Sequence, residues 1–282
     1  MDEQELKDFI EFTTGEPFEE PEEVDIPSDW DMYITYLDDN KALILLDLSL
    51  AQIAPIADYN QLFGVQIAIN QPTEDGFYTD EEQPRLFAVE DRVEAVFTQE
   101  GLCKFVATVT TAGTRMMYFY AKEADILPAL VGKVAAEHKD YQFNYMIQAD
   151  AQWNFYYSVL YPSVLELQLM KNRYVLKSME DAGEDLQALH DVCHWFFFGN
   201  GADRRQAAFK LKNRGYEIID DNFYEEKLAQ YPYGLRILGR HPLTLEQLNE
   251  QTYDHYDFIS EYDGVYDGWE LMPDGDNTDE WL

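Results

Sequence analysis

The sequence has few positively charged residues: its 282 residues include 20 Lys and Arg against 55 Asp and Glu, a formal net charge of −35. Charge of this sign and size repels phosphate backbones and anionic lipid headgroups. Direct nucleic-acid binding and membrane attachment are therefore not expected. Residues 1–29 hold twelve acids and one base, Lys7, while residues 254–282 hold ten acids and no base. This placement favours a basic partner, although acidic ends can also serve solubility alone.

Cysteine and long apolar runs are scarce as well. The two cysteines, Cys103 and Cys193, lie on separate strand-like apolar stretches, which predicts buried free thiols in a reducing compartment. The longest apolar run, residues 42–57, is interrupted by polar residues and falls short of a membrane span. The acidic opening residues do not form the pattern of a signal peptide. Together these absences predict a cytoplasmic protein.

Familiar catalytic motifs are missing too. The sequence contains no Gly-x-Ser-x-Gly elbow, no His-Glu-x-x-His and no Cys-x-x-Cys. His190 and His194 point the same way on a predicted strand, but two imidazoles do not complete a metal site. The Gly199-Asn200-Gly201 run lacks the third glycine and the lysine of a phosphate-binding loop, so we interpret it as a turn. No metal, no cofactor and no enzymatic activity are expected.

The sequence does contain enough apolar material for folded domains. With 46% hydrophobic and 15% aromatic residues it can bury one large core or two ordinary ones, and two domains are the preferred interpretation. Leu6, Phe9 and Ile10 share one face, which predicts a short helix over residues 5–12. We predict an acidic tail over 1–28, a first domain over 29–180, a second domain over 181–273 and an acidic tail over 274–282.

In the first domain, strand and helix patterns follow one another. Apolar residues at helical spacing predict helices over 84–97, at about 126–134 and over 163–179. The Thr111-Ala112-Gly113-Thr114 loop predicts a hairpin between two neighbouring strands. Strands are predicted over 30–37, 42–48, 63–69, 105–110, 116–120 and 141–147.

Several motifs of this half are similar to those of one known family. They are Trp30, the Gly113-Thr114-Arg115 turn followed by Tyr118-Phe119-Tyr120, and Asp150 with Trp153, Tyr157 and Tyr161-Pro162. Over about residues 29–180 they resemble the family catalogued as domain of unknown function 695. The resemblance implies no activity, so it supports a boundary and not a mechanism.

The second domain has a different order of elements. Its sequence pattern predicts a strand over 189–198, a helix over 203–214 that stops at Gly215, and strands over 217–223 and 235–238. A long helix capped by Thr244 with Gln247 and a last strand are predicted to follow. Strand, helix, strand, strand, helix, strand is the ferredoxin-like order. We therefore predict an α+β fold of two ferredoxin-like α/β sandwich domains, with antiparallel or mixed sheets and helices packed on one face.

The stretch from Tyr262 to Leu271 combines aromatics, glycines and carboxylates without one basic residue. We predict that Gly264 is a left-handed helix C-cap and that a last strand follows it. Asp267-Gly268 is the expected site of a bulge that turns Trp269 inward. Such a strand is more often structural than a binding surface, because buried aromatics usually belong to a core.

This stretch also carries a second resemblance. The Tyr266-Asp267-Gly268-Trp269 run, His194-Trp195-Phe196 on an earlier strand, and Arg214-Gly215-Tyr216-Glu217-Ile218 resemble the RraB family of protein regulators of RNase E activity, over about residues 184–273. The resemblance implies a small, acidic, non-catalytic protein that inhibits the endoribonuclease by binding it. The chain departs from the family by its long N-terminal extension and by one histidine where an adjacent pair is expected.

Charge and resemblance together predict a non-catalytic acidic regulator that binds a basic protein, such as the arginine-rich region of an RNase E-type endoribonuclease, and inhibits it. Asp263, Asp267 and Glu270 are the expected contacts, with Tyr262 and Trp269 as anchors. An immunity-type neutraliser of a basic toxin would use the same acidity. An enzyme or ligand-binding activity of the first domain is the remaining alternative. The full predicted partner-binding set is Tyr262, Asp263, Tyr266, Asp267, Trp269 and Glu270.

Overall fold

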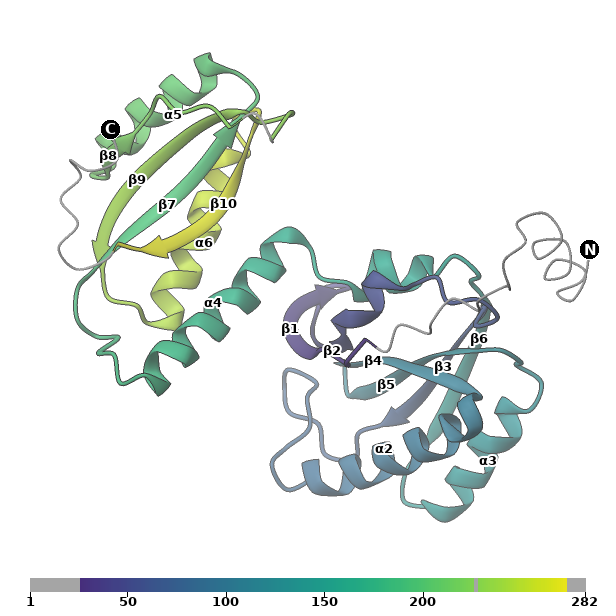
Figure 1. The fold of residues 1–282 in the computed structure, drawn as a ribbon. Helices are drawn as coiled ribbons and strands as arrows, with labels where there is room; N and C mark the ends of the chain where they lie inside the picture. Colours follow the sequence, from purple (N-terminus) through teal and green to yellow (C-terminus); the bar gives the residue numbers. More distant parts are fainter. Residues whose placement is uncertain (1–25, 226–227, 273–282) are drawn as a thin grey trace, which may run out of the picture.

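The computed structural model describes residues 26–225 and 228–272. Two sheets with their helices are joined by one long helix, α4 (Figure 1). The predicted helix over residues 5–12 and nearly all of both acidic tails lie outside the described residues. The N-terminal domain consists of β1 (Trp30–Leu37), β2 (Asn40–Asp47), the 3₁₀ turn η1 (Leu48–Gln52), β3 (Gln61–Ala68), α2 (Gln83–Phe97), the 3₁₀ turn η2 (Gln99–Gly101), β4 (Cys103–Thr111), β5 (Thr114–Ala121), α3 (Leu127–Glu137), β6 (Phe143–Ala149) and the π-helical turn η3 (Tyr156–Leu160).

After α4 (Val164–Asp181) comes the C-terminal domain. It contains β7 (His190–Phe198), α5 (Gly201–Asn213), β8 (Glu217–Asp220), β9 (Tyr233–His241), α6 (Leu245–Ile259) and β10 (Gly264–Leu271). Its four strands are arranged in the order β10-β7-β9-β8, and every described strand pair is antiparallel. With the first strand of the unit second in the sheet and the last strand at the edge, this is the predicted ferredoxin-like arrangement.

The N-terminal sheet repeats this topology within a larger sheet. Its six strands follow the order β1-β2-β4-β5-β3-β6, again with antiparallel pairs. The segment β3-α2-β4-β5-α3-β6 is itself a strand, helix, strand, strand, helix, strand unit, and its strands lie in the same relative order as those of the C-terminal domain. The β1–β2 hairpin then extends the sheet beyond β4. The predicted α+β fold with two ferredoxin-like domains is confirmed.

The N-terminal sheet is buried on both faces over its central strands. The helices α2 and α3 cover one face and form a core with Phe63, Val65 and Phe119 of the sheet. The other face has no such helix pair; the segment after β6 covers it, and Trp153 and Tyr156 pack there fully buried. The hairpin strand β1 extends past this packing and leaves four large side chains exposed: Trp30, Met32, Ile34 and Tyr36.

Several predicted turn positions are confirmed. Ala112 and Gly113 have φ of 47° and 75°, which is the two-residue hairpin turn expected between β4 and β5. Gly215 follows α5 with φ of 99°, as a helix stop should.

Both cysteines are buried and free, as predicted, and burial raises the pKa of each thiol to about 12.

The prediction for Gly264 was wrong, whereas that for Asp267-Gly268 is confirmed. Helix α6 ends at Ile259 with Ser260 as its C-cap, and Gly264 begins β10 without a left-handed φ. A Cβ at Gly264 would lie 2.9 Å from the carbonyl oxygen of Phe197, so close packing requires the glycine there. The register of β10 shifts between Tyr266 and Gly268, and Gly268 has φ of 99°.

Strand β8 is also shorter than predicted. It stops at Asp220 instead of continuing to Phe223, and β9 is longer than predicted at both ends. The phenyl ring of Phe223 lies over Gly234, where a Cβ would come within 1.9 Å of it. The apolar character of Phe223 therefore reflects packing on the sheet and not membership of a strand.

Helix α4 packs on both domains. It begins with a complete capping box, in which Ser163 and Glu166 each accept a backbone N–H of the other residue. Met170 packs in the N-terminal core, and Arg173 binds the carboxylate of Asp31 and the carbonyl oxygen of Met32 on β1. One turn further on, Leu176 packs in the C-terminal domain. The domain boundary at residues 180 and 181 stays a prediction, and the helix before it is shared.

Candidate partner-binding surface

The six predicted partner-binding residues lie on β10 and on the turn before it. Strand β10 forms one edge of the C-terminal sheet. Asp263, Asp267 and Glu270 are exposed, as contacts for a partner must be. The aromatic members differ: Tyr262 is half-buried, while Tyr266 and Trp269 have only 3% and 9% of their surface exposed.

Trp269 joins the C-terminal sheet to α4. Its indole Nε1 donates to Oδ1 of Asn172 at 2.7 Å, and Asn172 is itself fully buried. The Asn172 amide donates onward to Asn249 and Thr252 of α6, each at 3.0 Å. In this arrangement Trp269 satisfies a buried polar network between two helices, and a partner could reach its ring only after α4 had moved. Whether Trp269 anchors a partner remains a prediction.

The face of the C-terminal sheet away from α5 and α6 carries an unpredicted cluster around Trp195. Its indole Nε1 donates to Oε1 of Glu270 at 3.0 Å, and the guanidinium of Arg236 lies 4.9 Å from the ring centroid. Arg236 also pairs with Asp220 at 3.3 Å, and Phe223 stands edge-on to Trp195 at 5.8 Å. We call this group of Trp195, Phe223, Arg236 and Glu270 the Trp195 cluster.

The Trp195 cluster could not be assembled from the sequence. Trp195 belongs to the His194-Trp195-Phe196 motif, but its neighbours come from β9, β10 and the segment after β8. The strand register brings them together: Arg236 lies opposite Trp195 in β9, and Glu270 pairs with Cys193, two residues from Trp195. Only Glu270 was predicted, from its charge.

Backbone and side-chain contacts fix the turn between α6 and β10. The carbonyl oxygen of Asp263 accepts the N–H of Gly199 at 2.8 Å, and a Cβ at Gly199 would meet the Asp263 carboxylate at 2.1 Å. Lys210 of α5 pairs with Glu261 at 2.7 Å and lies 5.1 Å from the Tyr262 ring centroid. The exposed carboxylate of Asp263 is thus held on a turn of defined shape.

The edge of β10 is partly closed to a further strand. A Cβ at Gly268 would lie 2.7 Å from Oε1 of Gln168, which places α4 against this bulge. A bulge and a covering helix are two devices by which proteins block pairing at a sheet edge. The exposed carboxylates of β10 are therefore better suited to side-chain contacts than to addition of a partner strand.

Three histidines meet beneath β10, on the helix-covered face of the sheet. His194 Nδ1 lies 2.9 Å from the hydroxyl of Tyr266, and its ring centroid lies 4.5 Å from that of His255 and 6.1 Å from that of His241. Burial, followed by the neighbouring imidazoles, lowers the pKa of His194 well below its usual value. Burial and the charge of Arg214 lower the pKa of His255 to about 3. The imidazoles of His194 and His255 are therefore neutral near pH 7.

The described parts of the chain offer no metal site and no membrane helix. Among residues 26–225 and 228–272, no three His, Cys, Asp or Glu side chains come together in a way that could hold a metal ion. His190 is not paired with His194 but approaches the carbonyl oxygen of Asp185 at 2.9 Å. Within those same residues, no helix is long and apolar enough to cross a bilayer.

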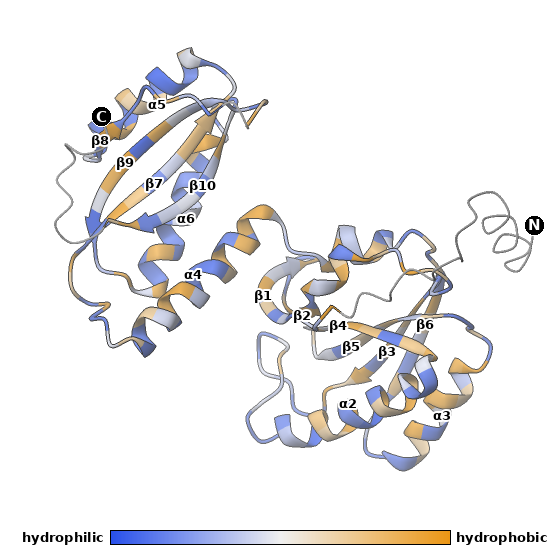
Figure 2. Ribbon diagram, in the orientation of Figure 1, coloured by the Kyte–Doolittle hydropathy of each residue, from blue (hydrophilic) through white to orange (hydrophobic). Residues whose placement is uncertain are grey.

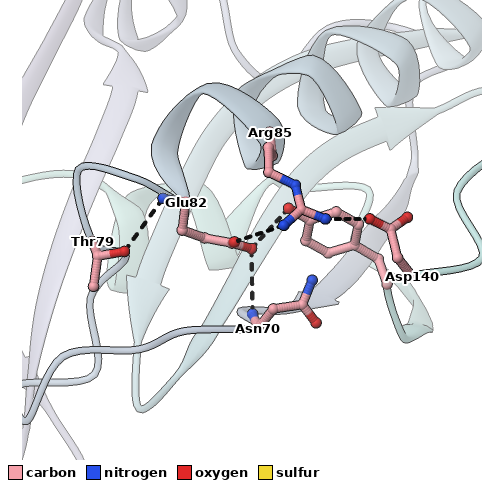
Figure 3. A network of polar contacts seen from close by, with 6 residues as sticks. Asn70, Thr79, Glu82, Arg85 and Asp140 are labelled. Carbon is pink, nitrogen blue, oxygen red and sulfur yellow. Dashed lines mark hydrogen bonds and ion pairs between the residues drawn. The ribbon is translucent and has the colours of Figure 1, made fainter.

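In the N-terminal domain the buried acidic groups join segments of the fold. Glu82, at the start of α2, has 1% of its surface exposed and accepts from the Tyr141 hydroxyl at 2.7 Å and the Asn70 N–H at 3.4 Å (Figure 3). Arg85 approaches it at 4.0 Å and binds Asp140 at 2.7 Å. The carboxylate thus ties the end of β3, the first turn of α2 and the start of β6 together.

The Asp150 motif has a similar role. Burial opposes ionisation of Asp150, yet hydrogen bonds from the Phe155 N–H and the Tyr120 hydroxyl, each shorter than 3 Å, hold its pKa below the usual value. Trp153 stacks on Tyr120 with 3.9 Å between ring centroids and donates its Nε1 to the Tyr59 carbonyl at 2.8 Å. Tyr120, Asp150 and Trp153 of the N-terminal motifs therefore build the buried second face of the sheet, whereas Phe119 packs against α2 and α3.

Comparisons with known proteins confirm both resemblances. Residues 28–161 match the model of a family of unknown function, DUF695, and residues 169–271 match the model of the family described as regulator of ribonuclease activity B. The second match begins within α4, earlier than the motifs alone predicted. The protein named regulator of ribonuclease activity B from Salmonella typhi is 25% identical over 122 residues, which cover 42% of this chain and 88% of that protein.

A solved structure of an unknown protein from Galdieria sulphuraria was also matched. It covers 76% of this chain and 98% of the other chain, at 9% sequence identity and a TM-score of 0.21. At that score the match carries no argument about fold or function.

Proposed function

We propose that this protein is a non-catalytic regulator of a ribonuclease of the RNase E type, and that it inhibits the enzyme by binding a basic segment of it. The match of residues 169–271 to regulators of ribonuclease activity supports a ribonuclease as the partner. The observation that carries the proposal is the set of exposed carboxylates Asp263, Asp267 and Glu270, on the edge strand and the turn before it, within that matched region.

The proposed contact is electrostatic with an aromatic centre. Arginine binds carboxylates bidentately and stacks on aromatic rings, so a basic segment lying along β10 could engage Asp267 and Glu270 and reach Trp195 beside them. Glu270 already accepts the Trp195 indole N–H, which holds the carboxylate in place before the partner arrives. Preorganisation of this kind lowers the entropy cost of binding. Charge attraction at long range would raise the association rate and make binding sensitive to salt.

The test is affinity capture of the protein's partners from lysate of its own host at low and high salt, with mass spectrometry of the retained proteins. We expect a ribonuclease at low salt and its loss at high salt. The variant Asp263→Asn with Asp267→Asn should capture much less of it. The matched control, Asp91→Asn with Glu123→Gln, removes the same charge from exposed positions of the N-terminal domain and should capture as much as the wild type.

Recovery of no ribonuclease at either salt concentration would show that a ribonuclease is not the partner. Recovery of a basic toxin in its place would favour an immunity-type neutraliser. Equal capture by the folded Asp263/Asp267 variant would show that these carboxylates are not the contact surface. A captured ribonuclease can then be assayed with added wild-type protein, where inhibition of RNA cleavage is expected.

A further inference from the structure

Helix α5 carries a basic surface on an otherwise acidic protein. The helix holds Arg204, Arg205, Lys210 and Lys212, and Arg214 follows it directly, so five of the 20 basic residues of the chain lie within fourteen positions. Figure 2 shows most of this helix as hydrophilic. Its one acid, Asp203, lies in the first turn. A local excess of positive charge on a chain of net charge −35 is a feature that solubility does not require.

Three of these bases are used within the fold. Arg204 lies 5.8 Å from the ring centroid of Tyr233, Arg214 lies 4.7 Å from that of Phe258, and Lys210 pairs with Glu261. Arg205 and Lys212 differ, because both are exposed and neither forms an ion pair with a carboxylate of the described residues.

Between the two free bases lies an exposed aromatic side chain. Phe209 has 69% of its surface exposed, four residues after Arg205 and three residues before Lys212, so all three share one helix face. Ala202, Arg205, Gln206, Phe209 and Lys210 line a shallow depression of about 450 Å³ beside it. An exposed aromatic ring between two cations that have no carboxylate partner among the described residues offers an apolar contact and a charge contact on the same helix face.

We infer that this face of α5, lined by Arg205, Phe209 and Lys212, is a docking site for a short acidic peptide segment that carries a large apolar side chain. Charge complementarity selects an acidic occupant, and the depression beside Phe209 has the volume for one apolar side chain with its neighbours. The site lies on a different element from the carboxylates of β10 and is independent of the proposed function.

The short extent of the basic face argues for a peptide over a nucleic acid. Arg205 and Lys212 are seven residues apart, which is roughly 10 Å along a helix. A longer polyanion would pass beyond this short stretch onto the surface of a chain of net charge −35, which repels it. A peptide with two or three carboxylates needs no more than the stretch itself.

The test is fluorescence anisotropy of the full-length protein with a labelled Asp-Glu-Trp-Leu-Asp-Glu peptide, its Asn and Gln counterpart, and a twelve-nucleotide single-stranded RNA. Saturable binding of the acidic peptide alone is expected. Phe209→Ala should weaken it about tenfold, and Arg205→Glu with Lys212→Glu should abolish it. Tyr174→Ala and Lys133→Glu with Lys139→Glu, at exposed positions elsewhere, should bind like the wild type.

Because all these positions are exposed, each variant should keep the far-UV circular dichroism and melting temperature of the wild type. Absence of saturable peptide binding by the wild type would overturn the inference. Equal binding of the uncharged peptide, tighter binding of the RNA, or unchanged binding by the α5 variants would overturn it as well.

Discussion

The two domains share one strand order but differ in what they leave exposed. In the N-terminal domain, α2 and α3 bury one face of the central strands and the segment around Trp153 buries the other. In the C-terminal domain, α5 and α6 bury one face, and the other carries the partly exposed Trp195 cluster beside the buried side chains of Cys193 and Phe197. A ferredoxin-like sheet can therefore be closed into a core on both sides or retain one face for contacts. The motif residues of the first domain serve packing, whereas those of the second include exposed carboxylates.

Because the two sheets differ in how far they are buried, replacing Trp153 in the first domain and Trp195 in the second should change the free energy of unfolding by different amounts. Trp153→Ala removes a fully buried ring that stacks on Tyr120 and donates to the Tyr59 carbonyl. We expect a loss of about 4 kcal/mol in the free energy of unfolding of the N-terminal domain. Urea unfolding followed by domain-resolved hydrogen exchange measures it. Tyr174→Ala, at a position 75% exposed, is the control, and an equally small effect of Trp153→Ala would show that the second face of this sheet is not a core.

The features that local sequence patterns encode were predicted correctly, and those that depend on contacts between distant segments were not. Strand and helix order, the Gly113 turn and the ferredoxin-like topology follow from alternation, helical spacing and glycine positions, and all are observed. The segment 150–161 has many aromatics but no regular period, so nothing in its pattern predicts that it covers a sheet. Glycine at position 264 was assigned to backbone conformation when close packing was the reason, and only the three-dimensional contacts distinguish these two causes.

The candidate surface was predictable only in its exposed charges. Asp263, Asp267 and Glu270 are exposed as expected for acids. The burial of Trp269 depends on Asn172 of α4, 97 positions away in the sequence. The role of Trp195 depends on the register of β7 with β9 and β10. Long-range register and helix docking are the properties that local patterns do not encode.

A second difference is sensitivity to acid, which should be greatest in the C-terminal domain. The folded-state pKa of His255 is about 3, below the unfolded value of 6.5, so the unfolded chain binds protons first as pH falls. Stability is fully present above about pH 6.5 and declines below it. Between pH 7 and pH 5, His255 alone should cost about 2 kcal/mol, and His194 adds to this in the same direction.

Urea midpoints of the C-terminal domain at pH 7, 6 and 5 measure this slope. In His255→Leu the slope over that range should be smaller than in the wild type, because one depressed pKa has been removed. If the wild type and His255→Leu lose the same stability between pH 7 and pH 5, His255 is not a cause of the acid sensitivity.

On the sheet face away from α5 and α6, replacing Trp195 should lower stability modestly and weaken binding more strongly. Trp195→Ala removes a ring that is only partly buried, unlike that of Trp153, and leaves Arg236 and Glu270 without their central contact, so we expect a loss of about 1 to 2 kcal/mol in unfolding free energy. Ribonuclease capture should fall at least about tenfold, because aromatic anchors dominate interfaces. Denaturation and capture by the same preparation test both, and full capture by Trp195→Ala would remove the Trp195 cluster from the contact.

The smallest effect on stability is expected at the bulge. Asp267→Asn changes an exposed side chain that follows Tyr266 and precedes Gly268, so the unfolding free energy should change by less than about 0.5 kcal/mol. Its capture of a basic partner should nevertheless become weaker and less dependent on salt. A stability loss much greater than this would mean that Asp267 serves the fold of β10.

The measurement that tests the central claim most directly is carboxylate footprinting of the protein with and without its captured ribonuclease, read by mass spectrometry. The account predicts that labelling of Asp263, Asp267 and Glu270 falls on binding, while labelling of Asp91 and Glu123 in the N-terminal domain stays unchanged. Protection of the N-terminal acids with unaltered labelling of Asp263, Asp267 and Glu270 would contradict it, and would place the contact on the domain whose sheet is buried on both faces over its central strands.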